Sequence, residues 1–119
     1  MCCDEKVLLI ESDPELCEQA ADFLWEEGFK VESASDDAGW RRRMDGGDFD
    51  IVILDLKMAG ADGVETARQI KAMAPGARIF MTDGRNVTDT LRMAENLSRM
   101  ALGQLTAPAK GYAEVHAYD

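Results

Sequence analysis

The sequence predicts an α/β protein whose parallel sheet is covered by helices on both faces. Short apolar runs of strand length alternate along the chain with segments whose apolar residues recur at helical spacing. This alternation is typical of parallel sheets that are built with right-handed crossover connections. The 119 residues are enough for one hydrophobic core, so we expect a single domain over residues 1–119.

The apolar run Ile51–Leu54 indicates the central strand. It is too short for a buried helix and rich in β-branched residues, so we expect it to be covered on both faces. Asp55 follows at the carboxyl end of this strand, the edge at which open α/β sheets bind their ligands. Gly60 and Gly63 predict that the chain then turns sharply.

The N-terminal half supplies two further strands and two helices. The pair Asp13–Pro14 is a strong helix start, because Asp favours the N-cap and Pro the first helical position. A glycine at the far end predicts where this helix stops. The predicted elements are a strand at Lys6–Ile10, a helix from Pro14 to Gly28, a strand at Phe29–Ala34 and a helix from Asp36 to Gly46.

The C-terminal half continues the alternation, but its pattern weakens toward the end. Asp62 is the expected cap of the next helix, and Pro75–Gly76 is its expected end. The predicted elements are a helix at Val64–Ala74, a strand at Arg78–Thr82, a helix at Thr88–Met100, a poor strand at Gly103–Ala107 and a short helix within Lys110–Asp119.

Composition excludes several classes of function. The net charge of −10 argues against direct nucleic-acid binding, which needs clustered Lys and Arg, and the short run Arg41–Arg43 is interpreted as a solvated helix face. Three cysteines without metal-ligand spacing predict no disulfide framework and no zinc site, which favours a cytoplasmic setting. No apolar stretch has the length of a membrane span and no signal peptide is recognisable.

Polar residues follow three of the predicted strands. Because parallel strands end at one edge of the sheet, Glu11, Ser12, Asp13, Asp55 and Thr82 should converge there. Oxygen ligands of this kind suit Mg²⁺. A carboxylate beside a bound Mg²⁺ can attack phosphorus and form an acyl phosphate, and a nearby hydroxyl can hydrogen-bond a phosphoryl oxygen.

Four segments resemble the receiver domain of bacterial two-component response regulators, and the resemblance covers nearly the whole chain. Asp50–Gly63 is similar to the phosphoacceptor segment of that family, with Ala59 in the place of a proline. The other three segments are Val7–Leu16, Ile79–Thr82 and Met100–Pro108. The chain is identified as an atypical member of the family.

The resemblance implies a flavodoxin-like fold, a doubly wound parallel sheet of five strands in the order 2-1-3-4-5 with helices on both faces and a short last helix. It also implies Mg²⁺-dependent phosphoryl transfer from a histidine kinase or phosphotransfer protein to Asp55, with Thr82 as the switch hydroxyl. The implied metal ligands are Glu11, Asp55 and the backbone carbonyl of Lys57, with Ser12 at a fourth position.

The chain departs from the family pattern at several of these places. Ser12 stands where the family has a metal-binding carboxylate, so we expect weaker Mg²⁺ binding. Asp83 adds a negative charge next to the switch hydroxyl, which would repel a phosphoryl group. Ala107 replaces the family's lysine, and Gln104 replaces its aromatic switch residue.

Three hypotheses for function follow. The first is a phosphorylatable receiver that switches contacts with a downstream protein, promotes at most its own phosphoryl transfer, and pairs into a homodimer through its last helices. The second is a degenerate receiver that binds proteins without phosphorylation. The third, an unrelated flavodoxin-like protein that binds a phosphorylated ligand or flavin, is the weakest, because no Gly-rich phosphate loop follows the first strand.

Trp25 and Trp40 are interpreted as packing residues, and His116 as a surface residue.

Overall fold

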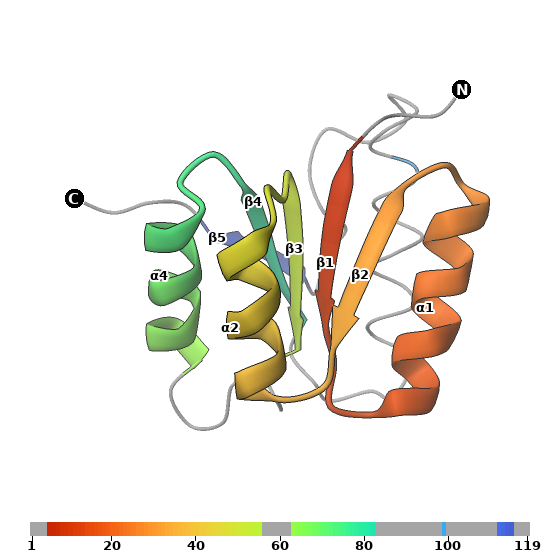
Figure 1. Ribbon diagram of the computed structural model, residues 1–119, viewed down its shortest axis with the longest axis horizontal. Helices are drawn as coiled ribbons and strands as arrows, with labels where there is room; N and C mark the ends of the chain where they lie inside the picture. Colours follow the sequence, from red (N-terminus) through yellow and green to blue (C-terminus); the bar gives the residue numbers. More distant parts are fainter. Residues whose placement is uncertain (1–4, 56–62, 83–98, 100–111, 116–119) are drawn as a thin grey trace.

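The computed structural model describes residues 5–55, 63–82, 99 and 112–115 (Figure 1). In this part of the chain one sheet contains five strands in the order β2-β1-β3-β4-β5. The strands are β1 (Lys6–Ile10), β2 (Lys30–Ala34), β3 (Ile51–Asp55), β4 (Arg78–Thr82) and β5 (Tyr112–Val115). The helices are α1 (Pro14–Glu26), α2 (Asp37–Gly46) and α4 (Gly63–Met73). The predicted α/β class and the predicted order of the first four strands are therefore confirmed, whereas β5 is a different segment from the predicted fifth strand.

The first four strands are parallel, as predicted, but β5 is not. Thr82 pairs with Tyr112 and Ile79 pairs with Val115, so β5 runs antiparallel to β4. The expectation of a fully parallel sheet is thus wrong for the last strand, and the expected C-terminal helix is wrong at Tyr112–Val115. Tyr and Val have high strand propensity, and pairing them with β4 covers an edge that would otherwise expose its backbone.

Two C-terminal predictions lie outside the described residues. These are the poor strand at Gly103–Ala107 and most of the helix at Thr88–Met100, of which only Arg99 is described, as helical.

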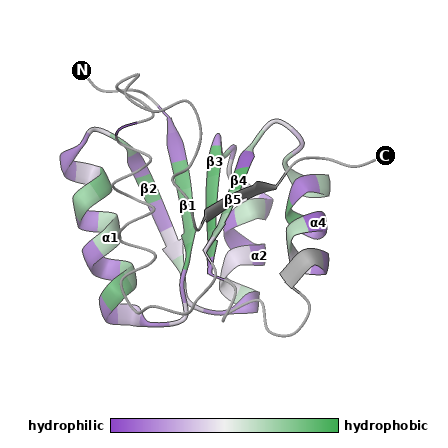
Figure 2. Cartoon of the chain, turned by 180° about the vertical axis from the view of Figure 1, so that it is seen from behind, coloured by the Kyte–Doolittle hydropathy of each residue, from purple (hydrophilic) through white to green (hydrophobic). Residues whose placement is uncertain are grey.

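The sheet is buried on both faces, because successive side chains of a strand point to opposite sides. Ile51 and Ile53 of β3 belong to the cluster beneath α1, whereas Val52 and Leu54 belong to the cluster beneath α2 and α4. All five residues of β3 are buried, which confirms the prediction of a central strand. Figure 2 shows the hydrophobic residues along β1 and β3.

The predicted start and end of α1 are also confirmed. Asp13 is the N-cap, and its Oδ1 accepts hydrogen bonds from the backbone N–H of Glu15 at 3.0 Å and of Leu16 at 3.4 Å. Pro14 is the first helical residue. Gly28 adopts a φ of 101°, a left-handed conformation that favours glycine and turns the chain into β2.

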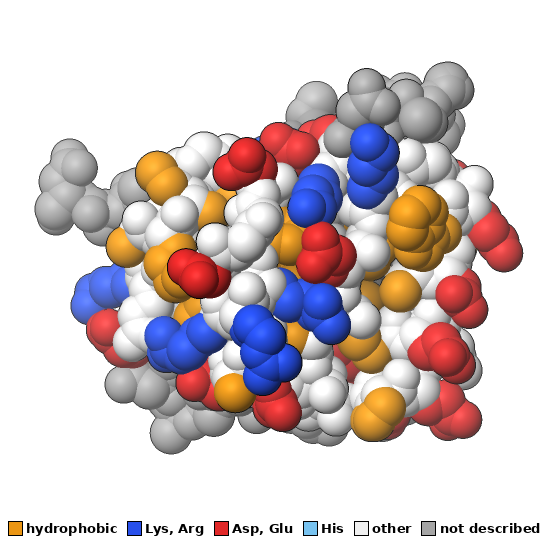
Figure 3. Space-filling view, viewed as in Figure 1, with side chains coloured by type: hydrophobic (Ala, Val, Ile, Leu, Met, Phe, Trp, Pro, Cys, Tyr) orange, Lys and Arg blue, Asp and Glu red, His pale blue; other side chains and the backbone are white. Residues whose placement is uncertain are grey.

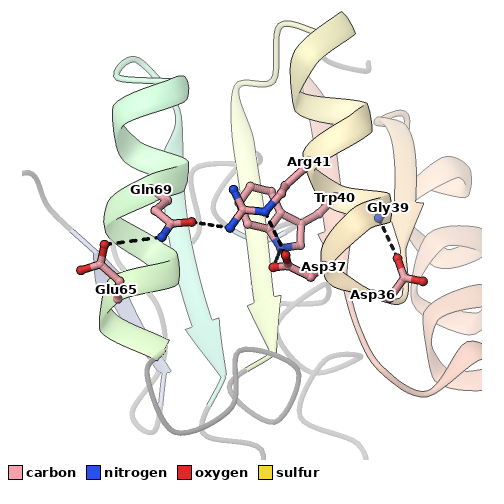
Figure 4. Close-up of polar contacts among 7 residues, drawn as sticks. All are labelled: Asp36, Asp37, Gly39, Trp40, Arg41, Glu65 and Gln69. Carbon is pink, nitrogen blue, oxygen red and sulfur yellow. Dashed lines mark hydrogen bonds and ion pairs between the residues drawn. The ribbon is translucent and has the colours of Figure 1, made fainter.

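A polar network joins α2 to α4 (Figure 4). Arg41 donates to Asp37 Oδ2 at 2.9 Å and to Gln69 Oε1 at 2.5 Å, and Gln69 in turn donates to Glu65. The Arg41 hydrogen bond holds the pKa of Asp37 below its usual value. The indole N–H of Trp40 also donates to Asp37, and the guanidinium of Arg41 stacks 4.4 Å from the centroid of the Trp40 ring.

Charge is distributed unevenly over the helices. Helix α1 carries four acidic residues and no Lys or Arg, whereas α2 contains the run Arg41–Arg43, all exposed as predicted. Figure 3 shows acidic side chains along α1 and a mixture of basic and acidic ones over α2 and α4. Among the helices in the described ranges, none is long and apolar enough to cross a membrane.

The two tryptophans have different roles. Trp40 is fully buried in the cluster beneath α2 and α4, so its interpretation as a packing residue is confirmed. Trp25 is 57% exposed near the end of α1, so the same interpretation is wrong for it. Trp25 directly follows the buried Leu24 in α1. Consecutive residues of a helix point in different directions, so the Trp25 side chain lies on the solvent side.

We expect Trp40→Ala to lower the free energy of unfolding by about 3–5 kcal/mol, because it opens a cavity in the core. Trp25→Ala is the matched control and should change it by less than about 0.5 kcal/mol. Urea unfolding followed by circular dichroism measures both. Equal losses in the two variants would contradict the burial of Trp40.

Candidate functional site

The buried polar side chains of the described residues all lie at one edge of the sheet. Glu11, Asp55 and Thr82 are 4%, 3% and 1% exposed, and they are the polar or charged residues that are buried in this part of the chain. Each stands at or just after the carboxyl end of a strand, the lower edge of the sheet in Figure 1. The sequence predicted all three as site residues, and the structure brings them to the same edge.

Strand register places these residues beside one another. Ile10 pairs with Leu54, so Glu11 leaves β1 next to the end of β3. Asp55 and Thr82 are paired directly across β3 and β4. Neighbouring strands lie about 4.8 Å apart, so a group bound to Asp55 is within reach of both neighbours.

Ser12 contacts Asp55 directly. Its Oγ donates a hydrogen bond to Asp55 Oδ2 at 3.3 Å, although the two residues are 43 positions apart in the sequence. This distance exceeds the usual 2.5–3.0 Å of an O–H···O bond, so the interaction is a weak one. The sequence placed Ser12 at the site as a metal ligand but did not predict this contact.

Glu11 is held by the loop that follows β1. Its Oε2 accepts a hydrogen bond from the backbone N–H of Asp13 at 3.1 Å, and its own backbone N–H donates to the carbonyl of Ala34 at 3.1 Å. Asp13 uses its side chain to cap α1, as expected from the sequence. Asp13 therefore fixes Glu11 through its backbone, and its carboxylate is engaged at the helix.

Thr82 carries an unsatisfied hydroxyl. Among the described residues, its Oγ1 is the buried side-chain polar atom that lacks a hydrogen-bond partner. Burying such a group costs about 1–3 kcal/mol, so each instance in a folded protein calls for an explanation. A hydroxyl that faces the position of a bound anion would be satisfied when that anion arrives.

The oxygen atoms of this edge suit a hard divalent cation. Mg²⁺ in proteins is usually held by one or two carboxylates together with waters and phosphate oxygens. Glu11 and Asp55 supply two carboxylates and Ser12 a neutral oxygen, so the donor set fits that ion. The described residues contain no group of three or more His, Cys, Asp or Glu placed to hold a metal.

Several predicted positions lie outside the described residues. They are Lys57, Ala59, Gly60, the helix cap Asp62, Asp83, Gln104, Ala107 and His116.

Cys17 lies near the site but has no reactive character. Burial raises the pKa of its thiol, and the charge of Glu11 raises that pKa further, against a lowering by the hydrogen bond with Ser33. The thiol therefore stays protonated at neutral pH, and a thiolate nucleophile is not available here. Cys17 also lines a cleft of about 410 Å³ between α1 and α2, together with Ser33 and Arg43.

The chain matches a known protein family over most of its length. The model of the response regulator receiver domain matches residues 7–110. The transcriptional regulatory protein TcrA of Mycobacterium tuberculosis is 31% identical over 87 residues, which are 72% of this chain and 34% of that protein. The uncharacterized transcriptional regulatory protein YclJ of Bacillus subtilis is 30% identical over 77 residues, which are 65% of this chain and 34% of that protein. The chain thus spans about a third of these relatives.

Solved structures show the same fold. A response regulator from Burkholderia pseudomallei, with a phosphorylated aspartic acid, a calcium ion and citrate, has a TM-score of 0.64 at 19% identity, covering 84% of this chain and 56% of that one. The response regulator TrrA from Thermotoga maritima, in complex with Mg²⁺ and BeF, has a TM-score of 0.60 at 26% identity. The match covers 82% of this chain and 80% of that one.

We expect Thr82→Val to raise the free energy of unfolding by about 1 kcal/mol, because a methyl group of similar volume replaces the unsatisfied hydroxyl. Thr82→Ser, which keeps the hydroxyl and loses the methyl group, should lower it. Urea unfolding measures both. A loss of stability in Thr82→Val would mean that the hydroxyl has a stabilising partner.

Proposed function

The chain belongs to the response regulator receiver domain family of two-component signalling. We propose that Asp55 is the residue of this chain that accepts a phosphoryl group. The observation that carries the proposal is the position of Asp55, a buried carboxylate at the carboxyl end of the central strand, paired directly with Thr82. A histidine kinase or a phosphotransfer protein is the donor implied by the family.

The transfer moves one phosphoryl group between two side chains. A carboxylate oxygen of Asp55 attacks the phosphorus of a phosphohistidine, so that a P–O bond forms and the P–N bond breaks. The histidine of the donor leaves with the electron pair of that bond and takes up a proton. The buried hydroxyl of Thr82 donates a hydrogen bond to a phosphoryl oxygen. This hydroxyl otherwise has no hydrogen-bond partner among the described residues.

A divalent cation, which we propose to be Mg²⁺, would be held by Glu11, Asp55 and the backbone carbonyl of Lys57, with Ser12 as a neutral neighbour. When bound, it supplies positive charge against the phosphoryl oxygens. Because Ser12 is uncharged, we expect this protein to bind the ion less tightly than a receiver with a carboxylate at the same place.

We propose that phosphorylation changes contacts with a downstream protein in the cytoplasm, and that the chain turns over no other substrate. The acidic net charge disfavours direct contact of this chain with nucleic acid. We also propose that two copies pair through the predicted helix at Thr88–Met100, of which only Arg99 is described; the expected final helix is not part of this proposal, because Tyr112–Val115 is strand β5. A phosphorylation-independent binding module is the less well supported alternative, because the acceptor carboxylate and the switch hydroxyl are both kept and buried.

Incubation with acetyl phosphate and Mg²⁺ tests the proposal. We expect intact-mass spectrometry to show one phosphate adduct on the wild-type chain and none on Asp55→Asn, because the amide is not a nucleophile toward phosphorus. Asp50→Asn is the matched control, since Asp50 lies just before the opposite end of β3 and accepts a hydrogen bond from the backbone N–H of Lys6 at 3.0 Å. This variant should be labelled like the wild type.

Two outcomes would overturn the proposal. One is a folded wild-type chain that takes no phosphate, which would favour the phosphorylation-independent module. The other is an adduct that persists in Asp55→Asn, which would move the acceptor to another residue.

A further inference from the structure

We propose that Ser12 is a positioning residue that holds the carboxylate of Asp55 in the cation-free protein and thereby lowers the affinity of the site for divalent cations. The inference rests on the proposed function of Asp55 as acceptor and goes beyond it. It assigns to Ser12 a role other than that of a metal ligand.

The position of Ser12 is fixed by its two neighbours. On one side the backbone N–H of Glu11 donates to the carbonyl of Ala34, which extends the pairing of β1 with β2. On the other side the side chain of Asp13 caps α1, and its backbone N–H donates to Glu11. Ser12 therefore lies between two anchored residues, and its Oγ donates a hydrogen bond to Asp55 Oδ2 at 3.3 Å.

The hydrogen bond stabilises the site without a cation. Two carboxylates at one buried edge repel each other unless donors or cations compensate them. Ser12 donates to Asp55, and the backbone of Asp13 donates to Glu11, so each carboxylate accepts a hydrogen bond from a neutral group. A carboxylate in place of Ser12 would add a third negative charge there and would remove one donor.

Both effects act on cation binding in the same direction. The hydrogen bond favours the cation-free state, and the missing charge weakens the cation-bound state, since affinity follows the number of ligand charges. At 3.3 Å the bond is weak enough to be given up when a cation or a phosphoryl group arrives. Ser12 is thus expected to stabilise one orientation of the Asp55 carboxylate in the cation-free protein.

Calorimetric titration of Mg²⁺ into the unphosphorylated full chain tests the inference. We expect Ser12→Asp to bind Mg²⁺ at least about tenfold more tightly than the wild type. Ser35→Asp is the matched control, because Ser35 directly follows β2 at the same edge of the sheet and is exposed. It should change the affinity by no more than about twofold, since a screened surface charge acts weakly. Equal affinities of the two variants would overturn the inference.

A second variant keeps the test decisive if Ser12→Asp does not fold. We expect Ser12→Ala to lower the melting temperature in the absence of Mg²⁺, and to lower it much less at saturating Mg²⁺, because the hydrogen bond acts only in the cation-free state. A purely structural serine would lower the melting temperature equally under both conditions, and that result would overturn the inference.

These readouts separate the inference from the proposed function. Both use unphosphorylated protein, so a chain that takes no phosphate but shows the Ser12 effects would contradict only the role of Asp55 as acceptor. A chain that is phosphorylated at Asp55 but shows neither Ser12 effect would contradict only the positioning role.

Discussion

The parallel register of β1, β3 and β4 is the constraint on which the site depends. It places the ends of the three strands at one edge, so that Glu11, Asp55 and Thr82 meet although they are distant in the sequence. The register is in turn fixed by burial on both faces, because a slip of one residue would exchange the side chains between the clusters beneath α1 and beneath α2 and α4. The position of Asp55, the proposed acceptor, is therefore a consequence of the core.

The same burial places the carboxylates of Glu11 and Asp55 where an uncompensated charge is costly. Glu11 and Asp55 lose most of their contact with water, yet each accepts a hydrogen bond from a neutral group in this loop. Thr82, in contrast, has a buried hydroxyl that lacks a hydrogen-bond partner in the described part of the chain. An arriving phosphoryl group would meet a held carboxylate on one strand and an unused donor on the next. Phosphorylation would thus supply an acceptor for the Thr82 hydroxyl, and a bound cation would compensate the charges of Glu11 and Asp55.

Sequence alone predicted the features that local chemistry determines. Asp13–Pro14 identified the start of α1, and the apolar run before Asp55 identified the central strand, because capping and burial act on a few adjacent residues. The antiparallel β5 was missed because pairing along the free edge of β4 is a tertiary effect. The Ser12–Asp55 contact was missed for a similar reason, since it depends on how the loop after β1 is anchored.

The most direct test of the account is nuclear magnetic resonance of the full chain on addition of Mg²⁺ and beryllofluoride, which stands in for a phosphoryl group on a carboxylate. The account predicts that the largest shifts fall on the backbone amides of Ser12, Asp55 and Thr82. Lys6 and Arg78, at the opposite ends of their strands, should change little. Shifts centred on those two residues, or no shifts in a folded chain, would contradict the assignment of this edge as the site.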